Sequence, residues 1–321
     1  MKTITINILL HNTDRNLLSV ILFFLNRVSV KNKEKVKLNF LISSNNFDYT
    51  SYIKNCMDSV SFGGIDFDLV EFSGAFDYPQ KMSFMSSVET EYMIKWDEDY
   101  FINNYALDYM IENVSVLNEN NLILAPVTST GIPTSELFVN DYFEEEDRRE
   151  IESEILKVSF PNIWGYDYSH LNEFTINSES WNGEDFYEAS NAINYHCKGI
   201  NPYRVGSCLQ KTINDKILKY PEKIKTYNQF EMVTLNRYYT NHFFLIKTKE
   251  YKKIISDRSL HVDQFDELPL NRYREIEGKN FIFVKGAFGI HPMYNTIYNV
   301  DNNKAREKEF MRNLESLIID G

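Results

Sequence analysis

Two aspartates follow an apolar segment that is typical of a buried strand. Residues 92–96 are mainly apolar, and Asp97, Glu98 and Asp99 come directly after them. Two carboxylates one residue apart on an extended segment can turn toward one cation, and Mg²⁺ or Mn²⁺ accepts such oxygen ligands together with substrate phosphates. A turn or a helix cap would use the same residue types. Because open α/β sheets bind ligands at the carboxyl ends of their strands, this position favours a metal site.

A second acidic pair and a histidine lie in the last third of the chain. Asp266 and Glu267 are adjacent at a predicted helix start, where one could act as a general base and the other support it, or both could cap the helix. His291 follows Glu267 by 291 − 267 = 24 positions and lies between Gly289 and Pro292, a loop-like pattern that would expose its imidazole to a transition metal. The two aspartates after the strand, the acidic pair and the histidine follow one another in this order along the chain. We therefore expect all three motifs to contribute to one site.

Hydrophobic periodicity predicts the elements that must position these residues. Strand and helix patterns alternate through the first 130 residues, which predicts an α/β fold with a mostly parallel sheet flanked by helices. The predicted strands are 4–10, 36–42, 65–72, 92–96 and 122–127, followed later by 242–247 and 281–285. The predicted helices are 14–25, 52–60, 79–88, 107–117 and a closing helix at 310–318.

At these motifs the sequence resembles the GT-A class of nucleotide-sugar glycosyltransferases. Asp97 and Asp99 match the D-x-D that follows the fourth strand in this class. Asp266 and Glu267 match its later acidic pair in reversed order, and His291 matches its metal-binding histidine. The resemblance implies a GT-A-like (Rossmann-like) fold with a central acceptor-side insertion.

The resemblance, which covers roughly residues 3–130 and 236–300, also implies an activity. It implies an inverting, metal-dependent glycosyltransferase that uses Mn²⁺ or Mg²⁺ and moves a sugar from a nucleoside-diphosphate donor, expected to be a UDP-sugar, to a hydroxyl acceptor. Alignment of Leu270 with the apolar residue after the family motif favours Glu267 as the base, with Asp266 as the alternative. The metal ligands implied are Asp97, Asp99 and His291. The donor-binding residues implied are Thr13, Arg15, Lys81, Trp96 and Glu98.

The middle of the chain is divided by charge. Residues 132–190 contain three basic and fifteen acidic side chains (3 − 15 = −12), whereas residues 198–258 contain thirteen basic and five acidic ones (13 − 5 = +8). Both stretches can be solvated surfaces. The basic stretch, which is interleaved with tyrosines, could instead receive an anionic partner such as DNA. We expect a nucleotide-sugar-binding half at 1–131, an acceptor-side insertion at 132–235 and a catalytic closing half with a C-terminal helix at 236–321.

The acceptor should be a saccharide or glycoconjugate, or a modified base in viral DNA. Large aromatic and hydrogen-bonding side chains can receive either one, by stacking and by polar contacts. The acceptor-side residues predicted on this ground are Trp164, Trp181, Tyr203 and His242. The segment 239–242 also stands where the family usually has a glycine-containing loop, so acceptor placement differs from the family pattern.

Composition excludes several classes of protein. The 321 residues are 43% hydrophobic with a formal net charge of −12, which indicates a folded chain. We expect neither a membrane span nor a signal peptide, and three cysteines without metal-type spacing favour a reducing, cytoplasmic compartment. The alternatives to a glycosyltransferase are a sugar nucleotidyltransferase and a non-catalytic nucleotide-sugar-binding protein. The glycine-rich, basic loop of nucleotidyltransferases is missing at 11–15.

Overall fold

A computed structural model describes most of the α/β part of the chain. The described residues are 3–10, 30–43, 51, 65–73, 77–129, 132–157, 213, 216, 220, 229–236, 239–261, 266–291 and 312. The predicted helices at 14–25 and 52–60, and all but Arg312 of the predicted closing helix, lie outside them.

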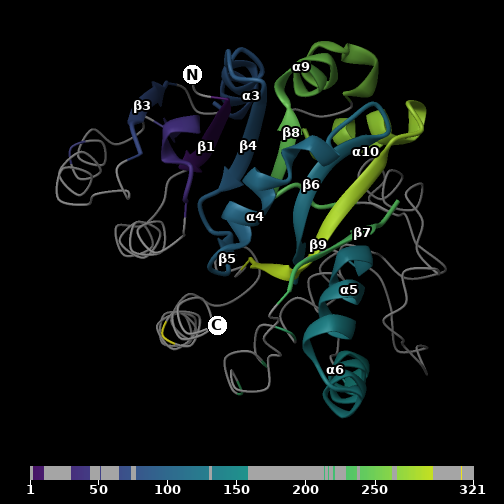
Figure 1. Cartoon of the computed structure of the whole chain (residues 1–321). Helices are drawn as coiled ribbons and strands as arrows, with labels where there is room; N and C mark the ends of the chain where they lie inside the picture. Colours follow the sequence, from purple (N-terminus) through teal and green to yellow (C-terminus); the bar gives the residue numbers. More distant parts are fainter. Residues whose placement is uncertain are drawn as a thin grey trace.

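The described residues form a nine-stranded central sheet with helices on both faces (Figure 1). The strand order is β3-β2-β1-β4-β8-β6-β9-β5, and β7 also pairs with β9. The strands are β1 (Ile4–Leu10), β2 (Val36–Ser43), β3 (Phe67–Phe72), β4 (Tyr92–Asp97), β5 (Phe101–Ile102), β6 (Asn121–Thr128), β7 (Glu231–Thr234), β8 (Phe243–Lys247) and β9 (Asn280–Ile290). The prediction of an α/β fold with a mostly parallel sheet flanked by helices is confirmed.

One antiparallel strand interrupts the parallel part of the sheet. Strands β3, β2, β1 and β4 run parallel, and so do β6 and β9. Strand β8 lies between β4 and β6 and is antiparallel to both. Because β8 runs backwards, its first residues lie beside the carboxyl end of β4, with Phe243 opposite Trp96. Alternating strands and helices did not predict this reversal, which brings the segment before β8 to the end of β4.

Two of the predicted helices differ in how closely the sequence indicated their ends. Pro79 lies in the first turn of α3, where proline needs no hydrogen-bond partner for its nitrogen. The predicted helix at 107–117 is shorter than expected, because α4 ends at Glu112 and a separate 3₁₀ turn spans Val114–Val116. The helices are α3 (Tyr78–Ser86), α4 (Ala106–Glu112), α5 (Ile132–Tyr142), α6 (Glu145–Lys157), α9 (Thr248–Ser256) and α10 (Glu267–Ile276), with two further 3₁₀ turns at Lys33–Lys35 and Arg258–Leu260. No helix in these ranges has the length and hydrophobicity that a membrane crossing requires.

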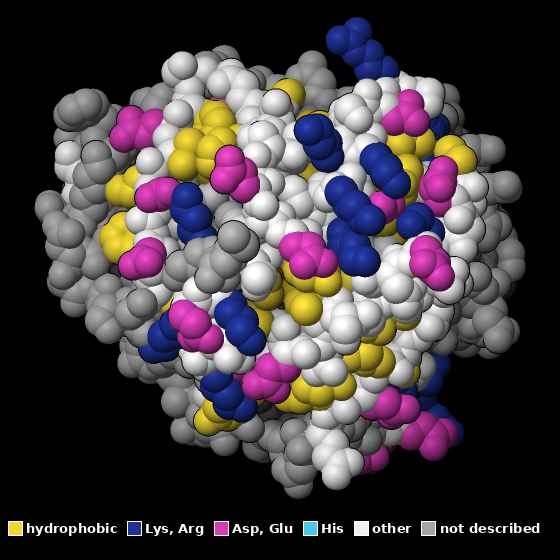
Figure 2. Space-filling view, turned by 45° about the horizontal axis from the view of Figure 1, so that its top comes forward, with side chains coloured by type: hydrophobic (Ala, Val, Ile, Leu, Met, Phe, Trp, Pro, Cys, Tyr) yellow, Lys and Arg dark blue, Asp and Glu magenta, His cyan; other side chains and the backbone are white. Residues whose placement is uncertain are grey.

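Helix α9 carries three exposed lysines of the basic stretch. Lys249, Lys252 and Lys253 are exposed, while Tyr251 and Ile254 face the core. Figure 2 shows Lys and Arg side chains gathered in one area of the visible face, with Asp and Glu side chains among them. Most of the remaining basic stretch lies outside the described residues, so its role in binding an anionic partner stays a prediction.

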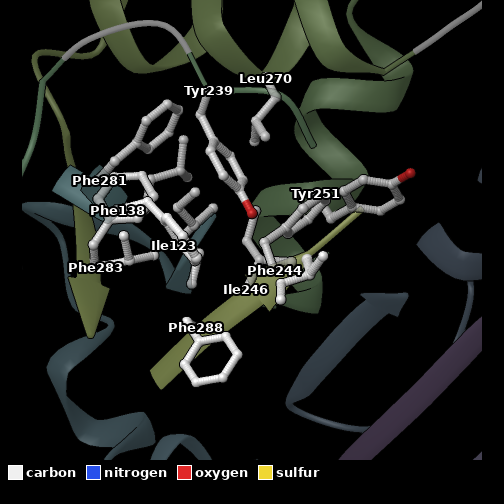
Figure 3. Close-up of a cluster of buried hydrophobic side chains, with 14 of the residues drawn as sticks. Ile123, Phe138, Tyr239, Phe244, Ile246, Tyr251, Leu270, Phe281, Phe283 and Phe288 are labelled. Carbon is white, nitrogen blue, oxygen red and sulfur yellow. The ribbon is translucent and has the colours of Figure 1, made fainter. Parts of the chain in front are cut away.

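Apolar side chains form one core on each face of the sheet. Strand alternation divides them: Ile94 and Trp96 of β4 face the side covered by α4, whereas Met93 faces the side covered by α3, α9 and α10. On the latter side, Tyr239 inserts between the phenylalanines of β9 and Phe244 of β8 (Figure 3). Its hydroxyl donates to the carbonyl of Phe243, so this buried tyrosine is hydrogen-bonded.

Helix α5, at the start of the predicted insertion, packs on this same core. The ring centroid of Tyr142 lies 5.1 Å from that of Phe288 in β9, and the ring centroid of Phe138 lies 6.1 Å from that of Phe288. Lys285 of β9 also pairs with Asp141 at 3.1 Å. The predicted domain boundaries at 131 and 235 remain predictions, although α5 contributes to the central core.

Candidate functional site

The first part of the site is the turn that follows β4. Asp97 is the last residue of β4, and the amide of Tyr100 donates to its carbonyl at 3.1 Å, which closes a tight turn over residues 97–100. Side chains two residues apart on a strand share a face, so Lys95 and Asp97 both point to the side of α3, α9 and α10. Asp97 and Asp99 are partly exposed, with side-chain exposures of 23% and 35%. Solvent and solutes can therefore reach both carboxylates.

His291 comes to this turn through the pairing of β5 with β9. Phe101 pairs with Ile290 in antiparallel register, which places the residues before β5 beside those after β9. As a result, His291 Nε2 lies 3.1 Å from Asp99 Oδ2. Two stretches of chain 192 positions apart (291 − 99) therefore meet at this turn.

His242 is a second imidazole at the same place. Its ring stacks on that of His291, with centroids 3.9 Å apart, and its Nδ1 lies 3.1 Å from Asp97 Oδ2. The amide of Asp97 donates to the carbonyl of His242 at 2.9 Å, which fixes the segment before β8 to the end of β4. We predicted His242 on the acceptor side. Its position beside His291 depends on the antiparallel direction of β8, which sequence periodicity does not specify.

Electrostatics keep both aspartates ionised. Burial raises the pKa of Asp97, but Lys95 and the hydrogen bond with His242 outweigh it and lower this pKa to about 2. Burial also raises the pKa of Asp99, and the nearby His291 reverses the effect, so that the pKa is lowered overall. Burial lowers the pKa of His291, yet Asp99 raises it above its usual value. For His242, burial and the neighbouring His291 lower the pKa.

Lys95 is a site residue that motif analysis did not single out. Its side chain is 1% exposed, and its ammonium lies 3.2 Å from Asp97 Oδ1 and 3.9 Å from Asp266 Oδ1. It also donates to the carbonyl of Asn241 at 2.8 Å. A lysine in an otherwise apolar strand, two residues before an aspartate, was the available signal. A buried lysine requires a charged partner, and Asp97 is the nearest one on its face.

The adjacent carboxylates Asp266 and Glu267 have different surroundings. Asp266 is fully buried and accepts hydrogen bonds from the hydroxyls of Tyr78 and Tyr251, each at 2.7 Å, and from the side-chain Nδ2 of Asn241. Glu267 begins α10 and is half-buried. All the contacts of Asp266 named here come from inside the protein, whereas Glu267 retains access to solvent.

Asn271 connects the start of α10 to the segment that ends in His242. Its side chain accepts a hydrogen bond from the Tyr239 amide at 2.8 Å and donates to the Tyr239 carbonyl at 2.9 Å. It also donates to the Glu267 carbonyl at 2.8 Å. This fully buried amide thereby fixes the region of the histidine relative to that of the acidic pair.

Two of the residues predicted to bind the sugar donor, Lys81 and Trp96, make their hydrogen bonds to other parts of the protein. The buried ammonium of Lys81 donates to the carbonyl of Leu10 and to Ser43 Oγ at 3.0 and 2.8 Å, and it lies 3.5 Å from Asp77. Trp96 is 5% exposed, and its Nε1 donates to the Tyr100 carbonyl at 2.7 Å. Glu98 is half-buried in the turn after β4. The other predicted donor and acceptor residues, Thr13, Arg15, Trp164, Trp181 and Tyr203, lie outside the described residues.

The donor atoms at the turn suit a divalent cation, although they are not already arranged around one. Carboxylate oxygens favour Mg²⁺ and Mn²⁺, and imidazoles favour transition metals. Across the described parts of the chain, no three His, Cys, Asp or Glu side chains surround a common point in a way that could hold a metal ion. Each aspartate is instead paired with an imidazole, so cation binding would require these pairs to separate.

Comparison with solved structures finds partial similarity to proteins that were solved with nucleotides or nucleotide-sugars. No protein-family model and no curated protein matches the sequence. A mannosyltransferase from Pyrobaculum calidifontis, solved with GDP-mannose and Mn²⁺, is 12% identical with a TM-score of 0.32, over 39% of this chain and 35% of the other. TarS from S. aureus, solved with UDP-GlcNAc, is 10% identical with a TM-score of 0.32, over 40% of this chain and 35% of the other.

A third structure aligns with nearly the whole chain. GalNAc-T7, solved with UDP, GalNAc and Mn²⁺, is 12% identical with a TM-score of 0.47, over 98% of this chain and 48% of the other. The chain spans between about a third and a half of the length of these structures.

Proposed function

We propose that this protein is a metal-dependent glycosyltransferase that moves a sugar from a nucleoside-diphosphate donor to a hydroxyl acceptor. The observation that carries the proposal is the meeting of Asp99 with His291 at 3.1 Å, beside Asp97 and His242. The two partners come from strands far apart in the sequence, as the D-x-D and C-terminal histidine of the GT-A pattern require. They lie at the carboxyl end of β4, where α/β sheets bind ligands.

Asp97, Asp99 and His291 would hold Mn²⁺ or Mg²⁺, and His242 is close enough to join them. When bound, the cation would supply positive charge to the diphosphate leaving group, on which negative charge grows in the transition state. The residues of this chain have a further task, which is to keep both carboxylates ionised. Lys95 and the histidines do so by lowering the pKa values of Asp97 and Asp99.

Glu267 is the proposed general base. In an inverting transfer, the acceptor oxygen bonds to the anomeric carbon as the bond from that carbon to the diphosphate breaks, with the electron pair leaving on the phosphate oxygen. The proton of the acceptor hydroxyl passes to a carboxylate on the opposite side of the sugar. Glu267 can receive it because it is partly exposed, whereas Asp266 is enclosed by Tyr78 and Tyr251.

The test is a donor panel assayed with and without Mn²⁺. GDP-mannose, UDP-GlcNAc and UDP-GalNAc are suitable first members, and release of the nucleoside diphosphate reports both hydrolysis and transfer. We expect release from at least one nucleotide-sugar in the presence of Mn²⁺, and its loss by more than about 100-fold in Asp99→Asn and His291→Gln, because charge stabilisation of the leaving group is lost. Asp68→Asn, an exposed aspartate on β3, is the matched control and should keep the wild-type rate.

The same assay separates the rival functions. A sugar nucleotidyltransferase would release pyrophosphate from a nucleoside triphosphate and a sugar phosphate. A non-catalytic binding protein would be stabilised by a nucleotide-sugar without releasing any product. Full activity in both Asp99→Asn and His291→Gln would contradict the proposed metal site.

A further inference from the structure

A buried positive charge lies directly behind the proposed cation site. The Lys95 ammonium is 3.2 Å and 3.4 Å from the two oxygens of Asp97, and the lysine side chain is 1% exposed. Asp266, on its other side, is 3.9 Å away. Lys95 is enclosed by this packing and paired with two carboxylates, which favour its charged form and keep the ammonium beside Asp97.

This ammonium opposes any cation that binds to Asp97. Two like charges a few ångströms apart repel each other, and because Lys95 is buried, its charge is screened less by water and salt than a surface charge would be. With neutral imidazoles, the formal charge of Asp97, Asp99 and Lys95 is −1 − 1 + 1 = −1. Lys95, which lies nearer to Asp97 than to Asp266, therefore offsets part of the negative charge that Asp97 and Asp99 present to a divalent cation.

We infer that Lys95 makes cation binding depend on the nucleotide. Lys95 neutralises Asp97, so that the free protein holds a divalent cation weakly, and the diphosphate of the donor supplies the missing negative charge. Nucleotide and cation then favour each other's binding, and their coupling is reciprocal. This inference rests on the proposed function, because it takes Asp97 and Asp99 as part of the cation site.

The experiment is a Mn²⁺ titration of the full chain, followed by the electron paramagnetic resonance signal of free Mn²⁺, with and without saturating UDP. For the wild type we expect weak Mn²⁺ binding alone and clearly tighter binding with UDP. Lys95→Met removes the charge and keeps the length of the side chain, so it should bind Mn²⁺ alone on the order of tenfold more tightly. The effect of UDP should shrink by a similar factor. Lys95→Arg keeps the charge and should behave like the wild type.

The possible outcomes distinguish this inference from the proposed function. Unchanged or weaker Mn²⁺ binding in Lys95→Met, together with a lower melting temperature, would make Lys95 a structural residue and overturn the inference. A wild type that binds no Mn²⁺ even with UDP would instead count against the proposed function. If Lys95→Met does not fold, the double variant Lys95→Met/Asp266→Asn decides the question. It removes the ammonium together with the buried carboxylate of Asp266, so that Asp266 is not left as a buried charge without its lysine partner. This double variant should also bind Mn²⁺ alone more tightly than the wild type.

Discussion

Asp266 and Glu267 are neighbours in sequence that we expect to differ in function. Glu267→Gln should lower the rate of sugar transfer by about 10²–10⁴-fold, the usual contribution of a general base, and leave the melting temperature unchanged. Asp266→Asn should instead lower the free energy of unfolding by about 2–4 kcal/mol, since Asp266 binds two tyrosine hydroxyls and faces the buried Lys95. Steady-state kinetics and thermal unfolding of both variants check this. A stable, inactive Asp266→Asn beside an active Glu267→Gln would reverse the two roles.

Gly289 is required by the close approach of Tyr100. A Cβ atom at Gly289 would lie 1.7 Å from Tyr100 Oη, and the tyrosine ring is buried and stacked near His242. Gly289→Ala should therefore lower the free energy of unfolding by about 1–3 kcal/mol, or displace the tyrosine and disturb the histidine. Gly278→Ala is the control: Gly278 has a φ of +60° and no atom within 4 Å of the added Cβ. It should cost about 1 kcal/mol, from backbone strain only. Equal losses in urea unfolding would contradict this account.

At the scale of elements, Glu250 joins α9 to α10 and to the turn before β9. It accepts a hydrogen bond from the Tyr273 hydroxyl at 2.8 Å and pairs with Lys253 at 2.9 Å and with Lys279 at 3.3 Å. Burial raises the pKa of Glu250, but these partners lower it to about 2. Because this carboxylate is buried, its contacts stabilise the packing of both helices.

The depressed pKa of Glu250 predicts a pH dependence of stability. A group whose pKa is lower in the folded state stabilises the protein above its unfolded pKa of about 4.3, and the contribution disappears as the pH falls through the folded value. Glu250→Gln should thus reduce the free energy of unfolding by about 1–3 kcal/mol at pH 7, and the difference from wild type should shrink between pH 4 and pH 2. Urea unfolding across this range measures it. A difference that stays constant with pH would show that the charge of Glu250 has no such role.

Hydrophobic periodicity predicted the bounds of several strands but not the end of β9. It correctly predicted β1, β2, β4 and β6 within a residue or two, since each has a long buried pattern. It did not predict that β9 continues to Ile290, because two glycines interrupt the apolar pattern at 286 and 289. The extension matters for the site, as the last residues of β9 pair with β5 and deliver His291.

At the scale of the whole molecule, α9 begins beside the start of β4, at the opposite end of that strand from Asp97. Lys247, just before α9, pairs with Tyr92 at the start of β4, five residues from Asp97, or about 17 Å along the strand. Charge reversal in Lys249→Glu/Lys252→Glu should therefore leave the KM for a saccharide or a DNA acceptor unchanged at constant ionic strength. Acceptor kinetics at two salt concentrations test this. A salt-dependent loss of transfer to DNA alone would place a DNA contact on α9.

The sequence by itself determined the main elements of the fold and the residue types of the site. A buried strand followed by Asp97 and Asp99 can be recognised locally, because periodicity and motif spacing are properties of adjacent residues. Only the tertiary structure decided which side chains meet: the reversed β8 brings His242 to Asp97, the β5–β9 pairing brings His291 to Asp99, and sheet packing encloses Lys95 between two carboxylates. These contacts join residues up to 192 positions apart (291 − 99), and strand order and direction, which set them, arise from the packing of the whole sheet.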